Sequence, residues 1–436
     1  MKKIFNFCKQ NAHLRQLMLI PLYVVLFSCF TGFVRAAKYQ QLVLKVLPFF
    51  SLPLLGVCIL RLRSRRCGAF VLAYLAWVLI TCLSRGLSSF SMKVNQLAFI
   101  EQCTICCVAL PFAYLSGDSG RKHLDRFLFV IVSVVAVCIW LCLLGTFTGR
   151  EIVIWRPALR FGATYTSTGR LMLRVLDLHY YHLGYLAVIC FFCTLYLAAA
   201  HRSSRLLPLW LLLLLTFAAA VLLTYSRTGV FALLAGLLLA FHVLLQRICP
   251  RRILRRVIFL CVILAGVFLT GAGMDFIYKA VHSIRDIWHG LSTLSSRTEI
   301  WSGGILALLK HPYALVFGFP LDTVMITVNE SIPLEDFIAH MHSGFMQVLV
   351  SLGVPGLLLV VLFFAVLGKR CRRLFFADAA DASGWASKFL ILIPFTAVLI
   401  NAFEGILLYG QSGQILLSVI TAMVSGYLLD ENRMPE

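Results

Sequence analysis

Acidic residues are scarce in this chain: Asp and Glu number 18 among 436 residues, against 39 Lys and Arg. The formal net charge is therefore +21, which in a soluble protein would favour a nucleic acid partner. The basic residues, however, cluster in short stretches between long apolar runs, such as RLRSRR at 61–66 and GKRCRR at 368–373. This clustering is the positive-inside pattern of a membrane protein, so we expect no nucleic acid partner.

Polar sequence is also in short supply, because 61% of the residues are hydrophobic, whereas soluble proteins are nearer half apolar. Many runs of about 18 or more residues carry no charge, which is the length that crosses a hydrocarbon core about 30 Å thick. The runs do not alternate apolar and polar residues, as the strands of a membrane β-barrel would. The sequence therefore predicts an all-α polytopic protein embedded in a lipid bilayer.

Cysteine is missing from the two longest polar loops, 149–178 and 274–343, although the chain has fifteen cysteines. A disulfide framework needs paired cysteines in an oxidising compartment, so we predict none. Cys103, Cys106 and Cys107 lie in an apolar segment without histidine partners, and we interpret them as small apolar residues of a helix. The acids of 274–343 lack a recognised metal-ligand spacing, so we predict neither a metal nor a cofactor.

The apolar runs predict about twelve transmembrane helices. We divide the chain into an N-terminal transmembrane bundle over 1–273, an extracytoplasmic loop over 274–343 that carries short helices, and C-terminal transmembrane helices over 344–436. Alternation from a cytoplasmic N-terminus puts the basic stretches and both termini inside, and loops 149–178 and 274–343 outside. The spans are expected at about 17–34, 42–60, 68–83, 94–115, 127–148, 180–200, 206–224, 228–246, 257–273, 344–367, 389–408 and 411–429, with a cytoplasmic linker at 374–388.

The long outer loop has helical patterns of its own. Over 276–291, apolar residues recur at helical spacing, which predicts an amphipathic helix along the membrane interface. Ser296 and Glu299 then match a capping box, with Ser296 as N-cap, and the helix is expected to end at His311-Pro312. Arg297 would project from this helix N-terminus, a place that favours a phosphate or pyrophosphate. The alternative is an ordinary exposed loop arginine.

Three further ionisable residues lie at predicted outer ends of spans. Arg227 occupies a very short outer turn, where it either serves a site or snorkels to the surface. His342 begins the span 344–367 and can take up a proton near neutral pH; His340 competes with it, and a purely structural histidine is the alternative. Glu404 lies near the outer end of a late span, where acids are costly, and it could orient an arginine or bind an acceptor.

Loop 149–178 is unusually basic for an outer loop. Its only acids are Glu151 and Asp177. Such a loop could bind an anionic glycan or a lipid headgroup, or it could simply rest on lipid phosphates. Its arginines are Arg150, Arg156, Arg160, Arg170 and Arg174, of which the last four are candidate accessory residues.

Three motifs together resemble the bacterial O-antigen ligase family, which includes related polysaccharide polymerases. The first is Ser226-Arg227-Thr228-Gly229, and the second is Ser296-Arg297-Thr298-Glu299-Ile300-Trp301 followed by Pro312 and Gly318. The third is His342-Ser343, nine residues, and then Gly353-Val354-Pro355-Gly356, whose glycines we expect to allow close helix packing. Two features depart from the family pattern: Ser343 replaces the Asn of many members, and the stretch 177–182 replaces an Asn-rich turn.

The resemblance implies a GT-C-like glycosyltransferase of the bacterial inner membrane, with its active site facing outward. The donor would be a glycan on polyprenyl pyrophosphate, and the acceptor a sugar hydroxyl on lipid A–core or another surface glycan. His342 would match the proposed general base, and Arg227 and Arg297 the arginines that hold the pyrophosphate. Fixed arginines can stabilise this leaving group, so a metal is not obligatory, and displacement by the hydroxyl would invert the anomeric centre.

Two other functions remain open. A polymerase would use the same fold and chemistry with another lipid-linked repeat unit as acceptor, and only the spacing of the third motif favours a ligase. A transporter or flippase for lipid-linked glycans would be expected to show two related halves and polar groups along a midplane path, neither of which we find in the sequence. The concentration of Arg227, Arg297 and His342 on the predicted outer side favours an enzyme.

Overall fold

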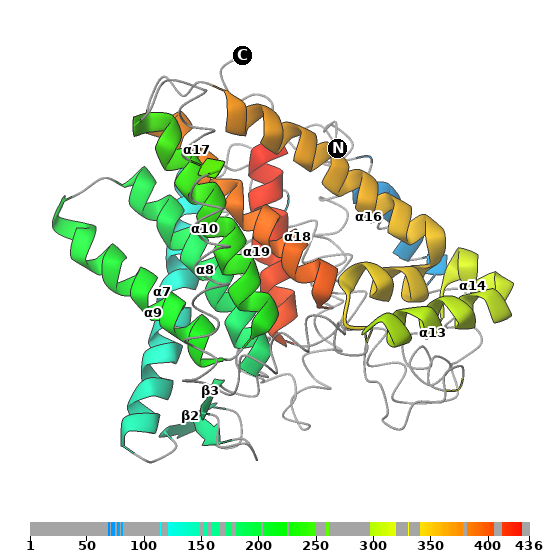
Figure 1. Ribbon diagram of the computed structural model, residues 1–436, viewed down its shortest axis with the longest axis horizontal. Helices are drawn as coiled ribbons and strands as arrows, with labels where there is room; N and C mark the ends of the chain where they lie inside the picture. The colour runs from blue at the N-terminus through cyan, green and yellow to red at the C-terminus, as the bar shows by residue number, and fades with distance from the viewer. Residues whose placement is uncertain are drawn as a thin grey trace, which may run out of the picture.

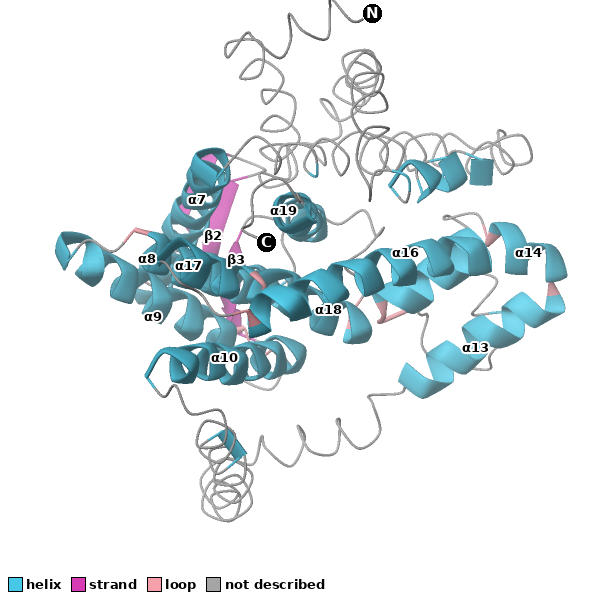
Figure 2. Ribbon diagram, turned by 90° about the horizontal axis from the view of Figure 1, so that it is seen from above, coloured by secondary structure: helices cyan, strands magenta, loops and turns pink. Residues whose placement is uncertain are grey.

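The computed structural model is mainly helical (Figures 1 and 2). The predicted spans at 17–34 and 42–60 and the helix at 276–291 lie outside the described residues, as do nearly all of 94–115 and 257–273. The division of the chain at 273 and 343 therefore stays a prediction. The described residues are parts of 69–81, Tyr114, 121–148, 152–155, 159–165, 171–175, 180–201, 204–224, 226–248, 259–260, 297–319, Glu330, 341–377, 382–404 and 412–429.

Long apolar helices form where the hydropathy predicts them. Within the described ranges, five helical segments are long and apolar enough to cross a membrane, and two shorter apolar helices accompany them. α9 shows why: most of its residues are Leu or Ala, which are strong helix formers, and its proline lies in the first turn, where no hydrogen bond is lost. The helices are α7 (Arg121–Phe147), α8 (Tyr180–Ala200), α9 (Leu207–Leu223), α10 (Arg227–Ile248), α16 (Gly344–Phe376), α17 (Ala382–Leu390), α18 (Leu392–Phe403) and α19 (Ser412–Leu429).

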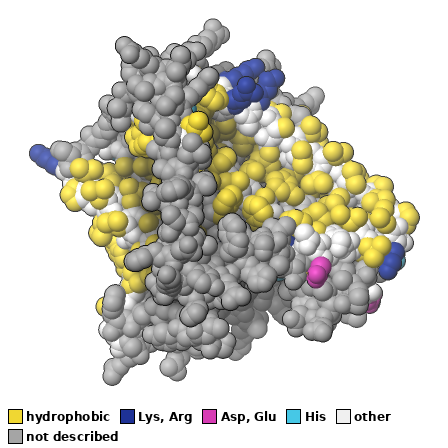
Figure 3. Space-filling view, in the orientation of Figure 1, with side chains coloured by type: hydrophobic (Ala, Val, Ile, Leu, Met, Phe, Trp, Pro, Cys, Tyr) yellow, Lys and Arg dark blue, Asp and Glu magenta, His cyan; other side chains and the backbone are white. Residues whose placement is uncertain are grey.

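α8 lies at the centre of the bundle. It packs against α7, α9, α10, α17, α18 and α19, and its residues 182–193 are all buried. The outer helices instead leave large apolar side chains exposed, as Figure 3 shows in yellow; examples are Leu215 on α9 and Leu358 on α16. Such surfaces suit contact with lipid chains rather than water, so the chain is a helical membrane protein.

Polar contacts mark the end of the bundle that we predicted to be cytoplasmic. Asp125 on α7 accepts a hydrogen bond from the Tyr196 hydroxyl of α8 at 2.7 Å and lies 3.1 Å from His201 Nε2. Lys388 on α17 donates to Gln246 on α10 at 2.6 Å. The same end carries the basic C-terminal turns of α16, visible as a dark blue cluster at the top of Figure 3. The N-termini of α10 and α16 and the C-terminus of α18 lie at the opposite end (Figure 1).

The all-α prediction is wrong for loop 149–178, which forms a small antiparallel sheet. Strands β1 (Ile152–Trp155), β2 (Leu159–Tyr165) and β3 (Leu171–Val175) pair in the order β1-β2-β3, with a register shift between Val153 and Trp155. The strand residues are rich in β-branched and aromatic types, and short connections let neighbouring strands pair locally. The sheet packs on α7 at the end of the bundle where α8 begins.

The predicted linker 374–388 is also wrong at both of its ends, which are helical. α16 continues to Phe376, and α17 already begins at Ala382, with Trp385 and Lys388 buried against the bundle. α17 and α18 are separate helices because Pro394 lacks an N–H and its ring would clash with the carbonyl of Leu390 in a continuous helix. The predicted span at 389–408 therefore extends over 384–403 in the structure.

Two short helices of the predicted outer loop pack against α16 (Figure 2). α13 (Arg297–Lys310) begins and ends where the capping box and His311-Pro312 predict, and α14 (Pro312–Phe317) follows it. Ser296 itself lies outside the described residues. The first residue of α13 is thus the arginine singled out by the sequence.

Gly353 interrupts α16 at the point where α14 meets it. Its φ of 70° and ψ of −174° are accessible essentially to glycine alone, and a Cβ there would overlap the carbonyl oxygen of Val316. Carbonyl groups just before the break accept hydrogen bonds from outside α16. Phe319 N donates to Val350 O at 2.6 Å, and Trp77 Nε1 donates to Leu352 O at 2.8 Å. The close approach predicted for this glycine is confirmed, and its cause is a helix break that seats α14.

Candidate active site

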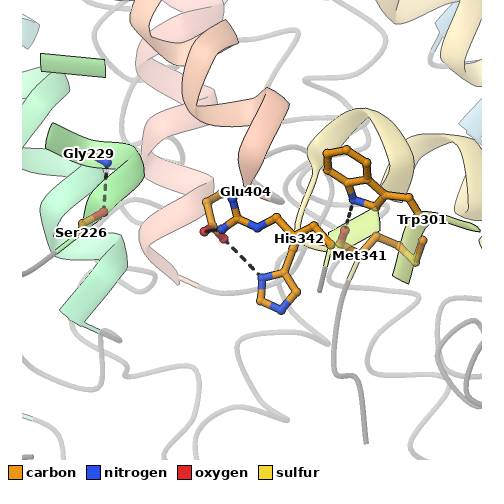
Figure 4. Close-up of polar contacts among 7 residues, drawn as sticks. Ser226, Gly229, Trp301, Met341, His342 and Glu404 are labelled. Carbon is orange, nitrogen blue, oxygen red and sulfur yellow. Dashed lines mark hydrogen bonds and ion pairs between the residues drawn. The ribbon is translucent and has the colours of Figure 1, made fainter. Parts of the chain in front are cut away.

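His342 has an unusual backbone conformation. Its φ is 46°, the only positive value at a non-glycine position in the described part of the chain, and such values often occur at functional sites. The preceding residue, Met341, is fully buried and held from both sides. Its N–H donates to Gln347 Oε1 at 3.1 Å, and its carbonyl accepts from Trp301 Nε1 at 2.9 Å (Figure 4). α13 and α16 together therefore fix the turn that presents His342.

Ser343 begins α16 as its N-cap. Its hydroxyl accepts from Met346 N at 3.4 Å, and Ser343 is buried. Ser and Asn are comparably good N-cap residues. The replacement of Asn by Ser at this position therefore preserves a helix cap next to His342.

The Glu404 carboxylate joins two of the candidate residues. Its Oε1 lies 2.6 Å from Arg297 Nη2, and its Oε2 lies 3.7 Å from His342 Nδ1, the contact drawn in Figure 4. The first distance is that of a short charge-assisted hydrogen bond, whereas the second exceeds hydrogen-bonding range. The Arg297 and Glu404 side chains are 17% and 16% exposed, and that of His342 is 37% exposed. One acid thus lies between a fixed arginine and an accessible histidine.

The backbone of Glu404 is held as well. Its N–H donates to Ile400 O at 2.8 Å, and its carbonyl accepts from Gly344 N at 3.1 Å. Since Gly344 is the first residue of α16 and Glu404 ends α18, this bond ties the two helix ends together. The carboxylate is therefore placed by main-chain contacts on either side of it.

Arg227 is the exposed first residue of α10. The preceding Ser226 acts as an N-cap: its hydroxyl accepts from Gly229 N at 3.1 Å, and its carbonyl accepts from Val230 N at 2.8 Å (Figure 4). One turn further along α10, Phe231 packs edge to face against Phe403, with ring centroids 6.1 Å apart. Phe403 adjoins Glu404, so the start of α10 lies close to the Glu404 cluster.

The accessory arginines are not brought into this cluster by any described contact. Arg156 and Arg170, like the competing His340, lie outside the described residues. Arg160 lies in β2 opposite Val153, and Arg174 lies in β3 opposite Gly162. The sheet packs on α7 and also touches α8 and α9, so a role for these arginines stays a prediction.

Several polar residues of the site were not singled out from the sequence. Tyr185 on α8 is 2% exposed, and the adjacent Gly184 packs against Ser226 at the start of α10. Gln347 accepts from Met341 N and so helps to hold the His342 turn, together with Trp301 of the second motif. The available signal was the occurrence of these polar groups near the ends of apolar helices, where a buried polar group needs a partner.

Residues 209–361 match the family model described as O-antigen ligase. The matched segment includes Arg227, Arg297 and His342 and ends before Glu404. A comparison with curated proteins gives no significant match. The resemblance that the three motifs indicated is therefore confirmed over the segment that contains them.

Proposed function

We propose that this chain is an inverting membrane glycosyltransferase of the O-antigen ligase family, whose model matches residues 209–361. It transfers a glycan from polyprenyl pyrophosphate to a sugar hydroxyl of a surface glycolipid, such as lipid A–core. The observation that carries the proposal is the Glu404 carboxylate, which contacts both Arg297 and His342 at the ends of three helices.

In this mechanism His342 is the general base. It takes the proton of the acceptor hydroxyl as the hydroxyl oxygen attacks the anomeric carbon of the donor. Glu404 faces Nδ1 of His342 at 3.7 Å, so it can orient the ring and stabilise the imidazolium that forms, as the acid of a catalytic triad does. The other ring nitrogen, Nε2, is then the atom that accepts the proton.

The two arginines act on the leaving group. The bond from the anomeric carbon to the pyrophosphate oxygen breaks, and polyprenyl pyrophosphate departs with the added negative charge. Arg227 and Arg297 each begin a helix, where backbone N–H groups and a guanidinium together favour a phosphate. Charge stabilisation by these fixed groups supplies the catalysis without a metal being required.

The surroundings of the site suit a lipid-linked donor. Large apolar side chains on α13 and α14, including Ile305, Leu309 and Val316, are exposed, as are Leu358 and Leu362 on α16. These residues let the polyprenyl tail remain in lipid while the pyrophosphate reaches Arg297. We propose a GT-C-like arrangement in the bacterial inner membrane, with both termini cytoplasmic and the site on the outer face.

The test compares glycans in the native host for the wild type, a deletion strain and a His342→Ala strain. A ligase predicts full-length chains stranded on polyprenyl pyrophosphate in both mutant strains. A polymerase predicts surface glycans limited to single repeat units. A deletion phenotype that His342→Ala fails to reproduce would contradict the enzyme and favour a transporter.

A further inference from the structure

Gln347 is a buried residue near the start of α16 that holds the chain on both sides of His342. Its side-chain oxygen accepts a hydrogen bond from Met341 N at 3.1 Å, and its own backbone N–H donates to Ser343 O at 2.8 Å. Met341 precedes His342 in the sequence, and Ser343 follows it. The two residues that flank His342 are therefore both bonded to the same glutamine.

The orientation of the Gln347 amide follows from its two side-chain partners. A backbone N–H can only donate, so the atom that faces Met341 N must be the carbonyl oxygen, Oε1. The other end of the amide, Nε2, donates to Ser351 Oγ at 3.1 Å. Gln347 is 2% exposed and Ser351 is 1% exposed, so both hydrogen bonds lie out of contact with solvent. The amide therefore cannot turn over without losing both of them.

Ser351 belongs to a segment of α16 that is fixed by the end of α14. A Cβ on Gly318, the C-cap residue of α14, would overlap the carbonyl carbon of Ser351, so the two backbones are in direct contact. The residue before it, Val350, accepts a hydrogen bond from Phe319 N at 2.6 Å. The Gln347 side chain thus connects the turn at the start of α16 to a part of the helix that is held from outside.

The turn needs such support because a positive φ is unfavourable for His342. A φ of 46° brings the Cβ of an L-residue close to neighbouring backbone atoms, so an unsupported turn would relax toward a negative φ. That change would swing the imidazole away from the Glu404 carboxylate, which lies 3.7 Å from Nδ1. The bond to Met341 N opposes the relaxation, because breaking it leaves a buried N–H unsatisfied.

We propose that Gln347 is a positioning residue, which holds His342 in its left-handed conformation so that the imidazole faces Glu404 and the acceptor hydroxyl. The proposal rests on the glycosyl transfer put forward above, in which His342 is the general base. Since Gln347 is buried beneath the turn, it acts through His342 rather than on the substrate. A neutral amide suits this position, because it offers one acceptor and one donor without burying a charge.

The central variant is Gln347→Met, which keeps the length of the side chain but removes both the acceptor and the donor. Lipids extracted from the deletion strain supply both donor and acceptor substrates for purified, reconstituted protein. We expect kcat to fall about tenfold, because the unsatisfied Met341 N–H favours the relaxed turn. The KM for the donor should change little, since the arginines proposed to bind the pyrophosphate are untouched.

The matched control is Gln246→Met on α10. The Gln246 amide also accepts one hydrogen bond and donates another, from Lys388 Nζ at 2.6 Å and to Phe375 O at 3.3 Å, but at the opposite end of the bundle. This variant should lower the melting temperature and keep kcat near the wild-type value. A loss of kcat as large as that of Gln347→Met would assign both effects to a general loss of structure and overturn the proposal.

Gln347→Glu tests the hydrogen bond itself. A glutamate oxygen can still accept from Met341 N, so kcat should lie within about threefold of the wild-type value. Equal losses in Gln347→Glu and Gln347→Met would contradict the positioning role, as would wild-type kcat in Gln347→Met.

A second variant covers the case in which Gln347→Met cannot be purified. Ser351→Ala removes the partner of Nε2 and should lower kcat about threefold, and wild-type kcat in this variant would count against the proposal. Full activity of His342→Ala would refute the proposed function itself. An inactive His342→Ala protein beside a fully active Gln347→Met protein would refute only the positioning role.

Discussion

Replacing Glu404 by Gln tests the centre of the site with almost no change of shape. The amide still accepts hydrogen bonds, but Arg297 loses its counter-charge and His342 loses the negative group opposite Nδ1. Breaking a fully buried ion pair costs about 3–5 kcal/mol, and an exposed pair contributes at most about 1 kcal/mol. Since the Arg297 and Glu404 side chains are 17% and 16% exposed, we expect a loss of about 2 kcal/mol in stability, between these limits.

The expected effect on turnover is larger than the effect on stability. In a tight serine-protease triad, changing the acid to its amide lowers kcat about 10⁴-fold. Here Glu404 Oε2 lies 3.7 Å from His342 Nδ1, which is beyond hydrogen-bonding range, so the acid acts mainly through its charge. We therefore expect kcat to fall about a hundredfold, with the transition-state barrier raised by about 2.7 kcal/mol.

The assay is single-variant kinetics of the reconstituted protein together with its thermal unfolding. Glu299→Gln is the matched control: Glu299 is an exposed acid in the first turn of α13, and Gln serves equally well in a capping box. It should keep wild-type kcat and stability. A Glu404→Gln protein that turns over at more than half the wild-type rate would show that the carboxylate has no part in the chemistry.

Substitutions at three other positions test the remaining parts of the site. Arg297→Ala should impair use of the donor more than Arg297→Lys does, because Lys keeps the positive charge but loses the planar guanidinium. Equal donor KM and kcat in both variants and the wild type would show that Arg297 does not belong to the site. Gly353→Ala should lower the free energy of unfolding by at least about 3 kcal/mol, since alanine is strained at this φ and its Cβ meets Val316 O; an unchanged melting temperature would contradict the proposed helix break. Ser343→Asn should keep both stability and activity, whereas Ser343→Ala should destabilise the protein by about 1 kcal/mol through loss of the cap, as thermal unfolding of the two variants would reveal.

Local chemistry predicted a large share of the helices. α8 occupies 180–200, as expected from hydropathy alone, and α13 starts at Arg297 and ends before His311-Pro312. Both predictions depend on neighbours in the sequence. The length of an apolar run predicts α8, and capping and helix-breaking residues predict α13. The sheet at 152–175 was missed because a search for membrane spans reads a polar stretch only as a loop, although its residues favour strands.

The site was only partly predictable for the same reason. Its titratable members, including Arg297, His342 and Glu404, stood out because charged residues at the ends of apolar spans are costly. Gln347 did not, since a single glutamine in an apolar span gives no sign that it accepts a hydrogen bond from Met341 N. Its role depends on the backbone turn at His342, which no periodic pattern reveals.

The sequence by itself determined that this protein is helical, membrane-embedded and basic at one end, because hydrophobic length and charge act locally along the chain. It also determined where α13 and α16 begin, and where α10 begins to within one residue. Only the tertiary structure decided that Arg297 and Glu404, which are 107 positions apart, form one ion pair. That pairing depends on how α13, α16 and α18 pack together, and packing is a property of side-chain shape in three dimensions rather than of sequence spacing.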